Sequence, residues 1–89
     1  MALIEHVLEL SALPAGRLPK QALSLARFSL LDWIACGLAG IDEPLARKLR
    51  QFALSEGGQG VSSVFGAGTA PACMASLVNG ATSHALDYD

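Results

Sequence analysis

The end of the chain carries its densest group of side chains that could do chemistry. Two carboxylates, a histidine and a phenol fall within six residues there, namely His84, Asp87, Tyr88 and Asp89. Side chains of these types move protons in active sites, and together they could line a pocket for acid/base chemistry. A frayed helix end with a solvated acidic tail would show the same composition. The spacing is not a specific metal-binding pattern, so we identify no metal site.

The segments that must position these side chains are mostly helical in pattern. Apolar residues recur at helical spacing in four stretches, which are 2–12, 19–39, 42–56 and 69–81. The second stretch is apolar on nearly every side, as expected of a central helix packed on several neighbours. Between Gly57 and Gly68 the composition changes to Gly, Ser and β-branched residues, with Val61, Ser63 and Phe65 alternating against Ser62 and Val64, which favours one short extended segment. The sequence therefore predicts an all-α, mainly helical fold with one short extended segment near 60–66.

Several residues are predicted to start, stop or anchor these helices. Gly40 is expected to cap the end of the second helix, and Asp42 to cap the start of the third. Asn79-Gly80 predicts a bend or an end in the last helix, because glycine weakens a helix by about 1 kcal/mol relative to alanine. The small residues of that helix permit close approach to a neighbour. Trp33 is expected to be a core anchor rather than a binding residue.

The second helix is long enough to raise the question of a membrane span. Eight Leu, Ile or Phe residues lie between Leu23 and Ile41, and they would favour insertion by roughly 2–5 kcal/mol. Arg27 and Asp32 near the middle would oppose it by roughly 5–7 kcal/mol. We therefore expect no membrane insertion.

Composition and charge exclude some partners and point to others. The net charge is −2 and no basic run is present, so we expect no nucleic-acid partner. Gly66 and Gly68 form a G-x-G without the other residues of a phosphate loop, so we expect no nucleotide binding there. Cys36 and Cys73 could pair, but buried thiols in a reducing cytoplasm fit their apolar surroundings better. With no cationic leader pattern at the N-terminus, a cytoplasmic location is expected.

The hydrophobic content is high for a chain of 89 residues. Hydrophobic residues make up 52% of the sequence and charged residues only 16%. A body of this size has too little interior for so many apolar side chains. We therefore expect a large apolar surface that is either exposed or covered by other protein.

Three ordered segments of the sequence share a resemblance to one family. They are Leu30-Leu31-Asp32 with Ala39-Gly40, Ser63-Val64-Phe65-Gly66 with Pro71-Ala72, and Asn79-Gly80-Ala81 with His84-Ala85-Leu86-Asp87-Tyr88-Asp89. The last segment resembles the motif N-G-A-x-x-H-A-x-D-[FY]-D-D of the MmgE/PrpD family, which includes 2-methylcitrate dehydratases and cis-aconitate decarboxylases. The resemblance covers residues from about Leu18 to Asp89.

The resemblance implies a cofactor-free lyase that acts on a small carboxylic acid and forms a homodimer. Asp87 matches the first aspartate of the motif, which lines the active site, so it is the expected catalytic residue. His84, Tyr88 and Asp89 are the expected substrate-binding residues. His84 fits a pocket wall and a structural hydrogen-bonding role equally well, and Asp89 matches the first of an adjacent aspartate pair.

Family members are several times longer than this chain. The resemblance therefore implies that residues 1–89 are the N-terminal part of the helical domain, without its C-terminal remainder or the lid domain. On this view the chain is a fragment that is inactive alone. The alternative is a small non-catalytic helical module that binds a partner protein through exposed apolar surface.

Overall fold

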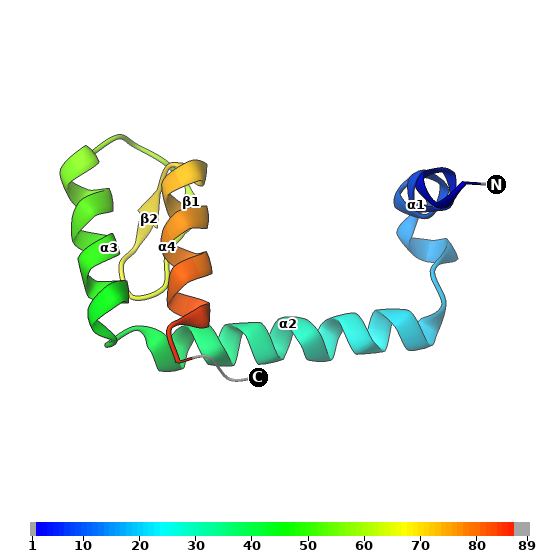
Figure 1. The fold of residues 1–89 in the computed structure, drawn as a ribbon, viewed down its shortest axis with the longest axis horizontal. Helices are drawn as coiled ribbons and strands as arrows, with labels where there is room; N and C mark the ends of the chain where they lie inside the picture. The colour runs from blue at the N-terminus through cyan, green and yellow to red at the C-terminus, as the bar shows by residue number, and fades with distance from the viewer. Residues whose placement is uncertain (1, 87–89) are drawn as a thin grey trace.

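The computed structural model describes residues 2–86, and it is mainly helical, as the sequence predicted (Figure 1). Its helices are α1 (Leu3–Ser11), α2 (Lys20–Gly40), α3 (Pro44–Glu56) and α4 (Ala72–His84), with a 3-10 turn at Ala15–Arg17. The strands β1 (Ser62–Ser63) and β2 (Thr69–Ala70) lie between α3 and α4.

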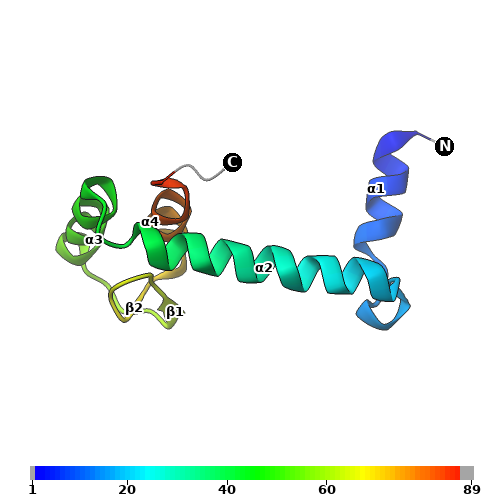
Figure 2. The same ribbon diagram turned by 90° about the horizontal axis from the view of Figure 1, so that it is seen from below.

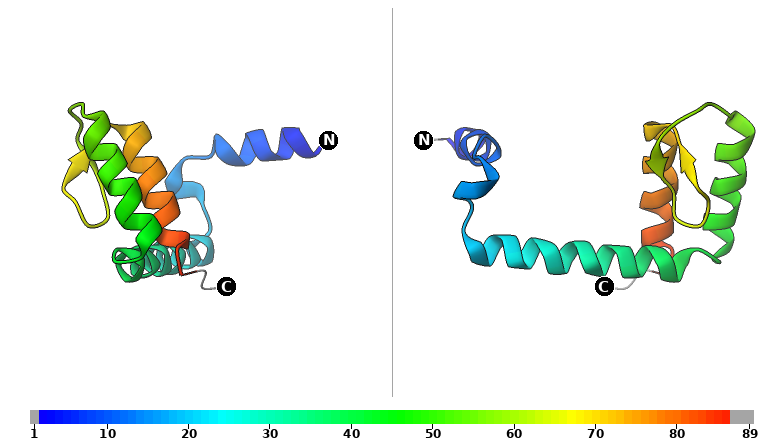
Figure 3. Two further views of the ribbon diagram at one scale, coloured as in Figure 1. Left: turned by 60° about the vertical axis from the view of Figure 1, so that its left-hand side comes forward. Right: turned by 180° about the vertical axis from the view of Figure 1, so that it is seen from behind.

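α4 is the element on which most of the packing converges. It packs against the C-terminal end of α2 and along α3, and the hairpin of β1 and β2 lies beside it. α1 stands at the opposite end of α2, away from the other helices, in every view (Figures 2 and 3). The chain therefore has one packed end, built from α3, α4, the hairpin and the last turns of α2.

Small side chains form the core of this packed end. Ala46, Ala75, Val78 and Thr82 are the buried side chains among the described residues. Gly37 and Gly40 of α2 are buried as well. A Cβ on Gly40 would overlap the carbonyl oxygen of Thr82, and a Cβ on Gly37 would overlap the ring of Phe65. The predicted close approach of small-residue helices is confirmed at this crossing.

The hairpin explains the glycines that follow α3. β1 and β2 pair antiparallel, with Ser62 opposite Ala70 and Ser63 opposite Thr69. Gly66 and Gly68 lie in the connecting turn with φ values of 87° and 44°, which favour glycine. The predicted extended segment is present. The sequence reading missed the second strand, because it assigned Thr69 to the following helix.

Two predicted helix caps are wrong. Gly40 is the last residue of α2, where its missing side chain admits Thr82, and Ile41 is the C-terminal cap. Glu43 rather than Asp42 stands at the N-cap of α3, where Pro44 presets the first helical turn.

Asp42 contacts Arg47 instead of capping α3. Its carbonyl accepts a hydrogen bond from Arg47 Nε at 3.0 Å, and its carboxylate lies 3.4 Å from Arg47 Nη2.

Of the bend or end predicted at Asn79-Gly80, the helix end is wrong, because α4 continues to His84. Asparagine weakens helices when its side chain competes for the local backbone. Here the carboxamide of Asn79 bonds the hairpin instead. A Cβ on Gly80 would meet no atom within 4 Å beyond its chain neighbours and the adjoining backbone of α4, so no close approach requires a glycine there.

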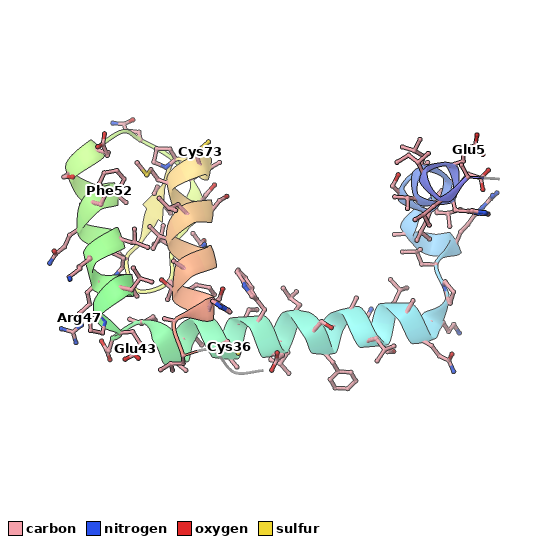
Figure 4. The ribbon with its side chains drawn as sticks, viewed as in Figure 1. Glu5, Cys36, Glu43, Arg47, Phe52 and Cys73 are labelled. Carbon is pink, nitrogen blue, oxygen red and sulfur yellow. The ribbon has the colours of Figure 1, made fainter. Side chains whose placement is uncertain are left out.

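Most of α2 is exposed in the described structure, against the prediction of a helix packed on several neighbours. Only Gly37 and Gly40 of this helix are buried. Trp33 is 41% exposed, so its predicted position in the core is wrong, although its ring packs against that of Phe65. Both cysteines are free and lie far apart (Figure 4). Cys36 is half-buried and Cys73 is exposed, so the prediction that both are buried is wrong.

The exposed area confirms the predicted excess of apolar surface. The chain exposes 6729 Å², whereas a compact protein of 9.2 kDa exposes about 4,900 Å². Its radius of gyration is 16.4 Å, against about 12 Å for a compact chain of this length. Large apolar residues of α1 and α2 supply much of the excess, including Leu3, Phe28 and Leu31 at 60–80% exposure.

α2 is also the one described helix that is long and apolar enough to cross a membrane. It has 21 residues, and its most apolar stretch of 18 residues has a mean hydropathy of 1.4. These properties are shared by core helices of proteins that do not enter membranes. Arg27 and Asp32 remain the argument against insertion.

Gly40→Ala tests the close crossing of α2 and α4. The added methyl group meets the Thr82 carbonyl, so we expect the free energy of unfolding to fall by about 1–3 kcal/mol. Gly80→Ala is the matched control, because it adds the same methyl group to a helix interior with open space. It should raise the free energy of unfolding by about 0.5–1 kcal/mol. Urea unfolding of both variants measures the difference, and equal effects would contradict the crossing.

Candidate functional site

The candidate site lies at the C-terminal end of α4. His84 is the last residue of that helix and is exposed to solvent. Asp87, Tyr88 and Asp89 lie outside the described residues, so their grouping with His84 stays a prediction. The structure thus places one of the four predicted site residues and the element that carries it.

The last turns of α4 are fixed on α2 by buried backbone contacts. Thr82 is fully buried, and its carbonyl faces Gly40. That carbonyl also accepts a hydrogen bond from the Ala85 N–H at 3.3 Å. Ser83 Oγ donates to the Gly80 carbonyl at 3.0 Å. The chain therefore leaves the helix from a defined point, where α4 meets the end of α2 (Figure 1).

Asn79 is a residue whose role the sequence reading missed. Its Oδ1 accepts a hydrogen bond from the Phe65 N–H at 2.9 Å, and its Nδ2 donates to the Ser63 carbonyl at 2.8 Å. One side chain on α4 thus satisfies both a donor and an acceptor of the hairpin. The signal was available, since Asn inside a helical pattern is unfavourable unless its carboxamide has partners elsewhere.

Phe65 connects the same hairpin to α2. Its ring lies over Gly37, and its centroid is 5.0 Å from that of Trp33, with the two rings tilted by 58°. This is a favourable distance for an aromatic pair. Asn79 therefore holds the hairpin against α4, and Phe65 holds it against α2.

The hollows beside these residues are shallow and do not include His84. One of about 380 Å³ lies between α2, β1 and α4, and another of about 250 Å³ adjoins it. Both are lined by Trp33, Ser63 and Asn79. Trp33 therefore has an exposed edge on a surface depression as well as its contact with Phe65.

The described residues contain no cluster of three or more His, Cys, Asp or Glu side chains that could hold a metal ion. His84 is the only ionisable residue of α4 apart from Cys73. A lysine or arginine beside His84 would therefore have to come from outside α4.

Comparison with known proteins gives one match. The sequence model described as the MmgE/PrpD N-terminal domain matches residues 9–89. The matched range includes all of α2, α3, α4 and the hairpin, and also the four predicted site residues. No curated protein and no solved structure matches the chain significantly.

Asn79→Ala tests how the hairpin is held. It removes both hydrogen bonds and leaves the Phe65 N–H without its partner, so the free energy of unfolding should fall by about 1–3 kcal/mol. Amide exchange at Phe65 should accelerate more than exchange within α3. Ser76→Ala, at an exposed position one turn earlier on α4, is the control and should change neither quantity. Unchanged exchange at Phe65 in Asn79→Ala would show that the hairpin does not depend on this side chain.

Proposed function

The chain belongs to the MmgE/PrpD family, and on this premise we propose that it forms the N-terminal part of the helical domain of a lyase. The proposed substrate is a tricarboxylate-like acid, with dehydration of 2-methylcitrate or decarboxylation of cis-aconitate as the reactions in view. The observation that carries this proposal is the family match over residues 9–89, which includes the His84 to Asp89 segment.

Such a reaction moves a proton at a carbon next to a carboxylate, and it requires groups that hold several negative charges. Asp87 is proposed as the acid/base or orienting residue. His84, Tyr88 and Asp89 are proposed to contact the substrate. The exposure of His84 at the end of α4 is compatible with this role, because a substrate can reach it.

The cations that hold the substrate must come from elsewhere in the assembly. The described residues of α4 carry no lysine or arginine. The proposed enzyme therefore completes its pocket with groups from beyond α4 or from a second subunit. We further propose a cytoplasmic, cofactor-free homodimer, for which the uncovered apolar surface of α1 and α2 provides contact area.

A second candidate function is a non-catalytic interaction module. The observation that favours it is the same exposed apolar surface, on a chain whose total accessible surface exceeds that of a compact protein by about 1,800 Å². A module of this kind would bind another protein through α1 and α2. Turnover separates the two functions, because the module has none.

Asp87→Asn in the full-length protein tests the catalytic assignment. Because the amide cannot accept a proton as the carboxylate does, turnover of 2-methylcitrate or cis-aconitate should fall by roughly 10²–10⁴-fold. The free energy of unfolding serves as the control and should be nearly unchanged. Unchanged turnover would remove Asp87 from the catalytic residues, and no turnover by the unmodified protein with any such acid would favour the interaction module.

Leu31→Asp tests the homodimer. Leu31 is 63% exposed, so an aspartate there leaves the core of this chain intact but places a charge on the proposed contact surface. Sedimentation velocity should show a dimer for the unmodified protein and a shift to monomer for the variant. Gln59→Asp, in the exposed loop after α3, is the control and should remain dimeric. A monomer before substitution would contradict the proposal.

A further inference from the structure

Arg50 of α3 is a cation with an unsatisfied buried nitrogen. The side chain is half-buried, and its Nη1 atom is inaccessible to solvent and has no hydrogen-bond partner among the described residues. Arg50 forms no ion pair with any of residues 2–86, whereas Arg47 is paired with Asp42. A buried guanidinium nitrogen without an acceptor is costly, and native proteins supply such groups with a partner.

The hairpin turn holds this guanidinium in place. Gly66 lies against it, and a Cβ on Gly66 would be 3.2 Å from both Cζ and Nη1 of Arg50. The positive φ of Gly66 and the lack of a side chain let the turn cover one side of the group. The Arg50 guanidinium therefore packs against the hairpin turn.

Two hollows with different side chains in their walls meet at Arg50. An open one of about 470 Å³ is lined by the polar side chains of Asp42, Arg47 and Gln51 together with Leu54, Gly66 and Ala67. Arg47 and Gln51 are one helical turn from each other on the same side of α3, and Arg47 lies near the start of that helix beside the turn that holds Glu43 (Figure 4). Asp42 is the only carboxylate that lines this hollow in the described structure, and Arg47 lies 3.4 Å from it.

The second hollow is smaller and apolar. It has a volume of about 90 Å³ and lies between α3 and the hairpin, where Ala53, Leu54, Val64 and Pro71 line it. Arg50, Leu54 and Ala67 line both hollows, so the guanidinium stands between a polar opening and an apolar cavity. A ligand with a negative head and a short apolar tail matches this pair of environments.

We propose that Arg50 binds the carboxylate of a short-chain aliphatic acid, whose tail enters the apolar cavity between α3 and the hairpin. Because Nη1 is closed to solvent, binding requires the hairpin turn at Gly66 to move away from the guanidinium. The carboxylate then accepts hydrogen bonds from the guanidinium, and Gln51 and Arg47 border its solvent side. This site is separate from the end of α4 and does not depend on the lyase proposal. Phosphate lacks the tail and therefore fits the polar hollow alone.

The test is a titration of the full-length, isotope-labelled protein with butyrate, acetate and inorganic phosphate, followed by NMR at constant ionic strength in sodium chloride. Butyrate should bind more tightly than acetate or phosphate, with shifts at the Arg50 side chain and the Gly66 amide. Arg50→Gln should weaken butyrate binding roughly ten- to a hundred-fold, since a charge-assisted pair is lost. Lys48→Gln is the control on the exposed side of α3 and should bind as the unmodified protein does.

Two further variants keep the test decisive. Ala53→Leu narrows the apolar cavity, so it should weaken butyrate binding and leave acetate binding unchanged. Arg50→Lys retains the charge but not the planar fork, and a severalfold loss is expected even if Arg50→Gln fails to fold. Equal butyrate affinity in the unmodified protein and the Arg50 variants would overturn the proposal. So would tighter binding of phosphate than of butyrate, or no butyrate binding.

Discussion

α4 crosses the end of α2 so closely that Gly40 could not carry a side chain without displacing Thr82, and the ring of Phe65 leaves no room for a side chain at Gly37. This contact is made by backbone and by the ring of Phe65 rather than by large aliphatic side chains. Ala75, Val78 and Thr82 fill the remaining space on α4. The position of every other element at this end follows, since α3 and the hairpin both pack on α4. Interiors are close-packed, so a crossing built from glycine tolerates few substitutions.

The hairpin acts as a brace between the two crossing helices. Asn79 holds its backbone from α4, and Phe65 carries its aromatic contact to Trp33 on α2. The turn at Gly66 reaches the third helix, where it covers the Arg50 guanidinium. A pair of two-residue strands would not be stable alone. Its order comes from these three attachments, and in return it fixes the spacing of α2, α3 and α4.

The sequence predicted the helices well and their ends and surroundings less well. Apolar spacing locates α1 through α4, because periodicity is a local property. The assignments of Gly40 and Asp42 failed for a tertiary reason, since each residue is committed to a partner that spacing does not show, Thr82 in one case and Arg47 in the other. The same holds for Asn79, whose partners are 14 and 16 residues away. The motif around His84 identified the family, whereas the surface of α2 could not be assigned a neighbour from local pattern.

The separation of Gly40 and Thr82 along the chain has a consequence for biosynthesis. Ribosomes add about 5–20 residues per second, so the 42 residues between the two contacts take roughly 2–8 seconds to emerge. During that interval α2 has left the ribosome but lacks the helix that secures it. The last turns of α2 around Gly37 and Gly40 are then uncovered, whereas the leucine-rich surface nearer the start of α2 stays exposed even after α4 has packed. The wait for α4 therefore delays the burial of the glycine-containing end of α2 and not of its leucine-rich surface.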